Sequence, residues 1–267
     1  MFVTQSAEGD RDLGKFPALS FKQRCTWGAH FFKALTKQHH TAFASRVVAL
    51  IPTDAVVIDV GAHAGQFTKL FAAMAPQGKV YASEPGSYAL SILKRVVALR
   101  GLKNVVVTSQ GFSDRECVEV LHVPLKKSGS VGFGLSHIGA ESTSSGRMTR
   151  TEQISLTTID QFVAQHQLKR VDFIKADIEG WEFNLLAGAR ETLKQYNPSL
   201  LLEVDESMLA RAGASPQAIF SAFDGLGYCF FRTDEKQGYR CWQVNGFEGN
   251  GDYLFMPQEK ASALKVD

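Results

Sequence analysis

The sequence predicts an α/β fold in which helices cover both faces of a mostly parallel sheet. From residue 55 onward, short β-branched runs alternate with longer stretches of helical periodicity, which is typical of strands joined by crossover helices. The runs VVIDV and SLLLEV are almost entirely apolar, as expected for strands buried on both faces. Hydrophobic residues make up 45% of the 267 residues, enough for one sizeable core.

The elements follow from this alternation. Parallel strands are expected at residues 55–60, 79–83, 104–108, 171–176 and 200–204. Helices are expected at residues 66–75 and 87–100, with a single helix at 182–195. After Leu226, the runs YCFFR, YRCWQV and YLFMP predict C-terminal strands, antiparallel to one another, with a turn at residues 234–238. These elements place the main domain at residues 53–260.

Residues 1–52 form an N-terminal extension of different character. Residues 1–20 are polar and are expected to be a loose arm. From Phe21 to Ile51 apolar residues recur at helical spacing, and Pro52 ends the pattern, so one or two amphipathic helices are expected. The favoured interpretation is a helix packed on the core. A cap over a substrate pocket and a peripheral membrane contact remain alternatives.

Residues 124–150 interrupt the strand–helix rhythm with a segment rich in glycine and serine. Connections of this length are typically functional or disordered. We expect a mobile loop beside the functional site, flanked by a hairpin of residues 117–123 and 153–156.

Charge and targeting signals narrow the classes of partner. The 29 basic and 27 acidic residues give a net charge of +2, so no nucleic-acid partner is expected. The sequence contains no secretory apolar segment and no run of about 18 apolar residues, which favours a cytoplasmic location. The four cysteines are widely spaced and match no zinc-site pattern. Oligomeric state has no signal in the sequence.

A glycine turn marks a cofactor site after the first strand. Asp59 ends the strand, Gly61 makes the turn, and Gly65 begins the helix. Free N–H groups at a helix start can bind a pyrophosphate or the methionine carboxylate of S-adenosylmethionine. An anion at Asp59 would repel a pyrophosphate but attract the methionine ammonium. His63, next to Ala62 in the turn, stands where the dinucleotide fingerprint requires glycine. Both features favour S-adenosylmethionine over NAD.

Two further segments are expected to hold the cofactor. Glu84, followed by Pro85, ends the second strand 25 residues after Asp59, and an acid at about this spacing typically binds ribose hydroxyls. A solvated glutamate is the alternative. After the third strand, Phe112, Ser113 and Asp114 are expected to face an adenine, with Asp114 accepting from its amino group.

The fourth strand ends in three charged residues at spacing two, Lys175, Asp177 and Glu179. This spacing puts them on one face, at the edge where parallel sheets bind ligands. The alternative is a solvated strand end before an acidic helix start. Glu203 ends the fifth strand and either lines the same crevice or caps the edge. Asp177, Glu179 and Glu203 offer the oxygens that hard cations prefer, but the pattern does not predict a metal.

Four blocks of the sequence resemble the FkbM-type methyltransferases. They are VIDVGAHAGQFT, SEP, TTIDQF running into VDFIKADIEGWEFNLLAGA, and PSLLLEV, and together they span most of residues 55–205. The resemblance implies a Rossmann-like class I methyltransferase fold with a seven-stranded sheet, and O-methylation of a hydroxyl on a sugar, glycolipid or polyketide product. Asp59, Gly61 and Gly65 match the family's cofactor turn, Glu84 its ribose acid, and Lys175, Asp177 and Glu179 its signature block. His63 replaces the family's usual asparagine, and histidine also donates a hydrogen bond.

A hydroxyl acceptor requires a general base. We expect Asp177 or Glu179 to orient or deprotonate it, with Lys175 tuning the charge. His137 in the long loop is a second candidate, because histidine titrates near neutrality. Alternatives are a protein or RNA acceptor, a non-catalytic cofactor-binding module, and an NAD dehydrogenase.

Overall fold

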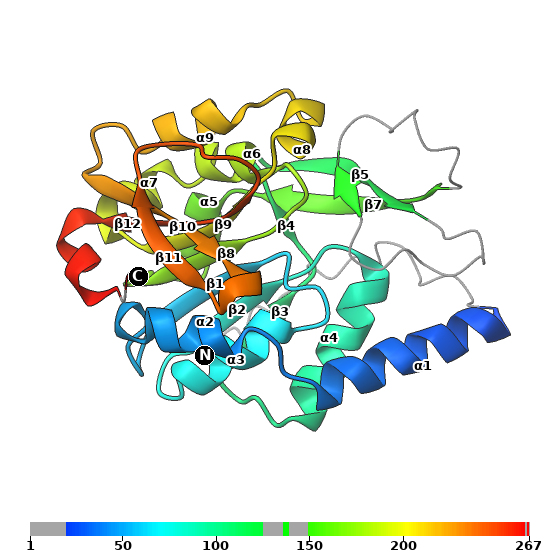
Figure 1. Cartoon of the computed structure of the whole chain (residues 1–267). Coiled ribbons are helices and arrows are strands. Elements are labelled where there is room, and N and C mark those ends of the chain that lie inside the picture. The colour runs from blue at the N-terminus through cyan, green and yellow to red at the C-terminus, as the bar shows by residue number, and fades with distance from the viewer. Residues whose placement is uncertain (1–19, 125–135, 139–148, 265, 267) are drawn as a thin grey trace, which may run out of the picture.

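The computed structural model describes residues 20–124, 136–138, 149–264 and 266. Its main sheet has the strand order β11-β10-β12-β9-β8-β1-β2-β3 (Figure 1). These strands are β1 (Val56–Val60), β2 (Lys79–Ser83), β3 (Val105–Thr108), β8 (Phe173–Ala176), β9 (Ser199–Val204), β10 (Tyr228–Asp234), β11 (Arg240–Val244) and β12 (Gly251–Pro257). Pairing is parallel from β9 through β3 and antiparallel between β9, β12, β10 and β11.

The α/β prediction and the three antiparallel C-terminal strands are confirmed, but the seven-stranded sheet that the family resemblance implies is one strand short. Eight strands pair in the described part of the main sheet. The additional one is β11, which turns back after η2 (Glu235–Gln237) and pairs with β10. The pairing satisfies backbone groups that an edge strand would otherwise leave open.

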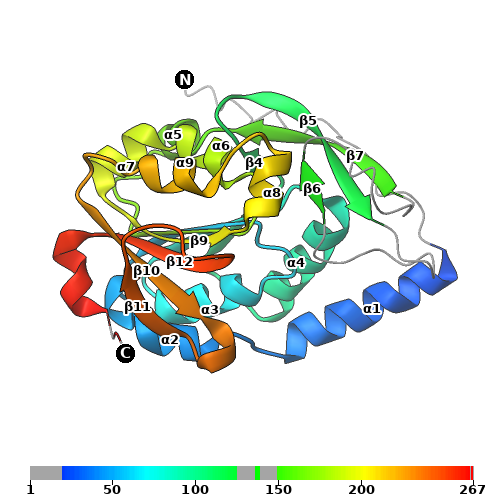
Figure 2. The same ribbon diagram turned by 45° about the horizontal axis from the view of Figure 1, so that its top comes forward.

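Helices cover both faces of this sheet (Figures 1 and 2). Side chains alternate between faces, so Ile58 and Ile174 pack in a core with α5 (Ile159–Gln165), α6 (Glu182–Ala187), α7 (Arg190–Tyr196) and α9 (Pro216–Ser221). Val57 and Phe173 pack on the other face with α2 (Thr41–Val47) and α3 (Gln66–Met74). Packing on both faces explains why these strands are apolar without a polar side.

The expected helix over residues 182–195 is wrong, because the chain breaks into α6 and α7. The break lies at Gly188, where an added Cβ would overlap the carbonyl oxygen of Ser113. The Gly188 carbonyl is turned to Asp160, whose N–H donates to it at 3.0 Å. Close packing of the segment after β4 (Gly111–Phe112) therefore interrupts the helix. Two short helices, α8 (Glu206–Arg211) and α9, follow β9.

A smaller sheet lies beside the main one, with the order β4-β7-β5-β6. Its centre is the hairpin of β5 (Cys117–Pro124) and β7 (Thr149–Thr157), which confirms the expected hairpin. β6 (His137–Ile138) pairs with β5. Most of the expected mobile loop at 124–150 lies outside the described residues.

The N-terminal extension packs on the main domain. α1 (Phe21–Thr36) lies along α4 (Ser87–Leu99), where Trp27 Nε1 donates to Ser91 Oγ at 2.9 Å. α2 and η1 (Val48–Leu50) join the core beneath α3. The carboxyl end of α1 is tied to α3 by Lys69 Nζ, which donates to the carbonyls of Ala34, in α1, and of Lys37, its C-cap residue, at 2.6 Å each. The expected arm at residues 1–20 lies almost wholly outside the described residues. No helix among the described residues is long and apolar enough to span a membrane.

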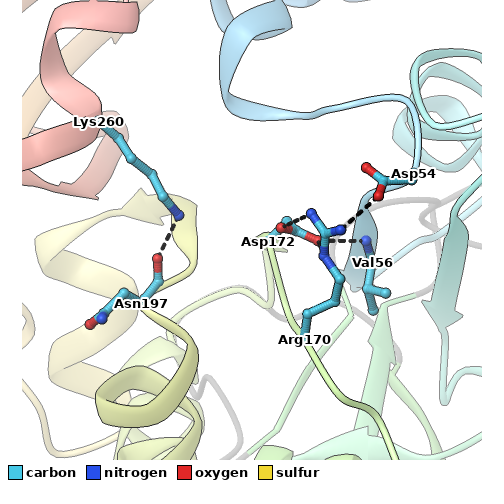
Figure 3. Close-up of polar contacts among 6 residues, drawn as sticks. All are labelled: Asp54, Val56, Arg170, Asp172, Asn197 and Lys260. Carbon is cyan, nitrogen blue, oxygen red and sulfur yellow. Dashed lines mark hydrogen bonds and ion pairs between the residues drawn. The ribbon is translucent and has the colours of Figure 1, made fainter.

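An ion-pair clamp holds the amino-terminal edge of the sheet (Figure 3). Arg170 binds both oxygens of Asp172 at 2.7 and 2.8 Å, and its Nη1 reaches Asp54 at 2.8 Å. Asp172 also accepts from the N–H of Val56 at 2.8 Å. The clamp joins the starts of β1 and β8, so that their ends are aligned at the opposite edge.

Candidate active site

A cavity of about 480 Å³ lies at the carboxyl edge of the parallel strands. Its size is in the range of small-molecule and cofactor sites. It is lined by residues that follow β1 (Gly61, Ala62, His63, Ala64), β2 (Glu84, Pro85, Gly86), β8 (Asp177, Ile178, Glu179) and by Lys175, Glu203 and Asp252. The polar part of the wall is completed by His40, Gln66, Tyr88, Ser136, His137, Glu152 and Glu235. The edge predicted from the sequence is therefore where the cavity lies.

The glycine turn brings β1 close to β8. Gly61 has φ +67°, and an added Cβ would overlap the carbonyl oxygen of Asp177. Gly65 has φ +85° and precedes the first residue of α3, with Leu93 Cδ1 2.9 Å from the position of a Cβ. Both positions thus need glycine, for conformation and for space.

Asp59 lies behind this turn rather than in the cavity wall. Its side chain is fully buried, and Oδ2 accepts a hydrogen bond from Thr68 Oγ1 at 2.6 Å. Burial raises the pKa of Asp59, against the attraction of Lys175. Oδ1 has no hydrogen-bond partner among the described residues. The hydrogen bond fixes the first turn of α3 to β1, and the expected contact of Asp59 with a methionine ammonium stays a prediction.

Glu84 ties the turn to the end of β2. Its Oε2 accepts from the N–H of His63 and its Oε1 from the N–H of Gly86, both at 2.8 Å. Burial nevertheless raises the pKa of Glu84 to about 7. His63 has φ +51°, and burial lowers the pKa of its imidazole to about 4, so the ring is neutral at pH 7. The proposed ribose contact of Glu84 stays a prediction.

The motif of Lys175, Asp177 and Glu179 begins on the sheet and continues into the wall of the cavity. Lys175 is buried, and its Nζ lies 3.2 Å from the Gly61 carbonyl and 3.5 Å from Asp177 Oδ2. Phe67 lies under the ammonium, with the ring centroid 5.5 Å from Nζ. Asp177 is half-exposed in the cavity, and the charge of Lys175 holds its pKa below the ordinary value. Glu179 has φ +57°, and burial together with Asp177 raises its pKa to about 7.

Two more carboxyl groups converge on Asp177. Glu203, whose role the sequence left open, lines the cavity, and burial and Asp177 raise its pKa to about 9. Its side chain hydrogen-bonds to Asp177. Asp252, which sequence reasoning missed, has a pKa raised to about 7 by burial and Asp177. A protonated Glu203 donates to an ionised Asp177 in this arrangement.

These acids are not arranged as a metal centre in the described part of the chain. Among the residues that the structure describes, no group of three or more His, Cys, Asp or Glu side chains is arranged to hold a metal ion. The same holds for Asp177, Glu179 and Glu203, whose oxygens the sequence offered as possible metal ligands.

His40 is a cavity residue that the sequence did not reveal. It stands between α1 and α2 with φ +61°, and its ring stacks on Phe67 at 4.3 Å between centroids. Its Nδ1 lies 3.2 Å from Glu235 Oε1 and hydrogen-bonds to the Tyr239 hydroxyl. Glu235 and Tyr239 come from the β10–β11 turn, about 200 positions further along the chain. No local motif could have marked a contact of this separation.

The remaining predicted residues lie in different places. His137 lines the cavity, and its ring lies 5.5 Å from that of His122 on β5. Phe112, Ser113 and Asp114 are absent from the cavity wall. Phe112 is buried edge-on against Phe162, and Ser113 accepts from Trp181 Nε1 at 3.2 Å. Their contact with an adenine stays a prediction.

Comparison with known proteins identifies a family. The model of the methyltransferase FkbM domain matches residues 59–241. The chain is 27% identical over 237 residues to the AMB antimetabolite synthetase AmbE of Pseudomonas aeruginosa, covering 75% of this chain and 11% of that protein. It is 24% identical over 151 residues to Methyltransferase 1 of Beauveria bassiana, covering 53% of this chain and 61% of that protein. The chain thus spans only part of the length of both relatives.

Solved structures of methyltransferases are also similar. The methyltransferase FkbM from Methylobacillus flagellatus has 15% identity and a TM-score of 0.48, over 86% of this chain and 60% of that one. The O-methyltransferase from Bacillus cereus in complex with SAH has 11% identity and a TM-score of 0.45, over 88% and 87%.

Proposed function

Because the chain belongs to the FkbM family of S-adenosylmethionine-dependent methyltransferases, we propose that it methylates a hydroxyl group of a sugar, glycolipid or polyketide-type product. The observation that carries this proposal is the cavity, in which the glycine turn and a set of titratable side chains share one space. Methyl transfer mainly requires that the acceptor be positioned beside the sulfonium and deprotonated. Cofactor-binding and acceptor-activating groups are therefore expected side by side.

The charge of the cavity supports a hydroxyl acceptor over a nucleic acid. Among the described residues, seven Asp or Glu residues line it, and Lys175 is the one Lys or Arg. Carboxylates accept hydrogen bonds from hydroxyl groups, and they repel phosphates. They also suit the net positive charge of S-adenosylmethionine. The same carboxylates would attract an amine, which makes an amino group the second candidate acceptor.

The contacts suggest a division of roles. Asp177, held ionised by Lys175, orients the acceptor hydroxyl. His40, backed by Glu235, takes the hydroxyl proton as the oxygen attacks the methyl carbon. The carbon–sulfur bond breaks, its electron pair stays on sulfur, and S-adenosylhomocysteine leaves. Glu179 and His137 line the same cavity and are the other candidate bases.

The test separates binding from transfer. Calorimetry measures S-adenosylmethionine affinity, and transfer of a labelled methyl group is followed over a panel of sugars, glycolipids, polyketides, amino sugars, peptides and RNA. We expect Asp177→Ala to lower turnover by at least about 100-fold while cofactor affinity changes little. Glu84→Ala should instead weaken cofactor binding by about tenfold or more, because it removes the carboxylate that fixes the turn.

Three results would contradict the proposal. Near-normal turnover of Asp177→Ala would remove its assigned role. Methyl transfer to peptides or RNA alone would show that the acceptor is not a sugar, glycolipid or polyketide-type product. Cofactor binding with no transfer to any member of the panel would favour a non-catalytic binding module.

A further inference from the structure

α1 exposes an apolar stripe to solvent. Phe21 and Phe32 are 84% and 67% exposed. They are eleven residues apart, which at 100° per residue places them about 20° from each other around the helix and about 16 Å apart along it. Cys25 and Ala29 lie between them and are also exposed. The stripe runs along most of the helix, which lies at the edge of the molecule (Figure 2).

The opposite face of α1 is fixed against α4, so this exposure is a property of the fold. His30 Nδ1 lies 3.0 Å from the Tyr88 hydroxyl, and Trp27 donates to Ser91. Ala34 is 2% exposed, and Arg95 of α4 stacks over Trp27 at 5.0 Å. Rotating α1 to bury the phenylalanines would break these contacts.

Basic side chains flank the stripe on both sides. Lys22 and Lys33 lie on one side of it and Arg24 on the other, Lys37 follows as the C-cap of the helix, and all four are exposed. No Asp or Glu occurs between Asp12 and Asp54. An apolar stripe bordered by cations is the pattern of a helix that lies in a membrane interface.

We propose that α1 docks on an anionic membrane surface, with Phe21 and Phe32 inserted at the headgroup level and the four basic side chains against lipid phosphates. A symmetric contact between two copies would bring these like charges together. A nucleic acid would meet the cations but leave the stripe unmatched, since rings about 16 Å apart do not stack on neighbouring bases. The proposal does not depend on the identity of the methyl acceptor.

Vesicle co-sedimentation of the full chain tests it. We expect binding to vesicles of phosphatidylcholine mixed with phosphatidylglycerol, little binding to phosphatidylcholine alone, and weakening at high salt. The double variant Phe21→Ser with Phe32→Ser should bind the anionic vesicles about tenfold more weakly. Val118→Ser is the matched control, because Val118 is 59% exposed on β5 far from α1 in sequence. Calorimetry with S-adenosylmethionine checks that each variant remains folded.

The proposal is overturned if the wild-type chain ignores anionic vesicles, or if the double variant binds them as well as the Val118→Ser control does. Sedimentation equilibrium supplies a second readout. A dimer that dissociates in the double variant would show that a second copy, rather than a membrane, covers the stripe.

Discussion

His40 has the surroundings of a general base for a hydroxyl. The Glu235 carboxylate and the Tyr239 hydroxyl lie at Nδ1, which favours the tautomer protonated there and leaves Nε2 to accept a proton. Stacking on Phe67 fixes the plane of the ring. Burial lowers the pKa of His40, while Glu235 opposes this effect, so the neutral ring is favoured relative to a free histidine.

Replacing this side chain should change both the rate and its pH dependence. Glutamine at His40 keeps a polar side chain but cannot take a proton, so His40→Gln should lower kcat by about 100-fold. A neutral base is required, so the wild-type rate should rise with pH through the His40 pKa, which lies below the ordinary histidine value, and then level off. The variant should lack this rise. The control is His39→Gln, at the exposed neighbouring position. A His40→Gln rate within about threefold of the wild-type rate would exclude His40 as the general base.

At the scale of elements, the site depends on how β1 and β8 end. Their register runs from Val57 opposite Phe173 to Val60 opposite Ala176. One residue beyond, Gly61 passes so close to Asp177 that no side chain fits between them. Lys175 Nζ contacts the Gly61 carbonyl, so the same approach positions the ammonium that holds Asp177 ionised.

Gly61→Ala should therefore damage stability and binding together. The added methyl must displace Asp177, and such overpacking costs about 1–3 kcal/mol, which lowers the unfolding midpoint by roughly 2–12 °C. S-adenosylmethionine affinity should fall about tenfold or more as the turn moves. Gly101→Ala separates strain from crowding, because Gly101 has φ +62° with no atom within 4 Å. Equal affinity losses in the two variants, measured by calorimetry, would refute the crowding argument.

Elements that depend on local sequence were predictable, and those that depend on distant contacts were not. The parallel strands and the Gly61–Gly65 turn follow from apolar runs and from glycines at required positions. The break at Gly188 depends on Ser113, 75 positions earlier, and the placement of His40 depends on Glu235. The motif residues Lys175, Asp177 and Glu179 were found because they are charged and lie at a predicted strand end, but strand periodicity does not place all three, since β8 ends at Ala176 and Glu179 has φ +57°.

At the scale of the whole molecule, the fold gathers carboxyl groups in one place, although the composition is nearly balanced in charge. The net charge is +2, yet the ends of β2, β8 and β9 and the start of β12 bring Glu84, Asp177, Glu203 and Asp252 to one cavity. The opposite edge holds the Arg170 clamp (Figure 3). A near-balanced sequence therefore carries a site rich in carboxyl groups, because parallel strands deliver their ends to the same edge.

Because these carboxyl groups are buried close together, we expect the cofactor-free protein to lose stability between pH 6.5 and 8. The pKa is raised to about 7 for Glu84, Glu179 and Asp252, to about 8 for Glu182 and to about 9 for Glu203. Ordinary values lie near 4, so in this window the folded state holds protons that the unfolded state has released, and stability falls as pH rises. The pKa values of His63 and Lys69 are lowered, to about 4 and about 8. These two shifts make stability rise with pH, but chiefly outside the window from pH 6.5 to 8.

Thermal unfolding at several pH values measures this effect. The wild-type midpoint should decline steadily from pH 6.5 to 8, and Glu203→Gln should flatten the decline because it removes the carboxyl group with the largest rise in pKa. Glu191→Gln is the control, since Glu191 is 75% exposed in a surface ion pair with Lys194, and it should leave the slope unchanged. Saturating S-adenosylmethionine should also reduce the decline, because its positive charge favours the ionised carboxylates. A midpoint that stays constant over this range in the cofactor-free protein would show that these acids are already ionised in the folded state, which would contradict the prediction.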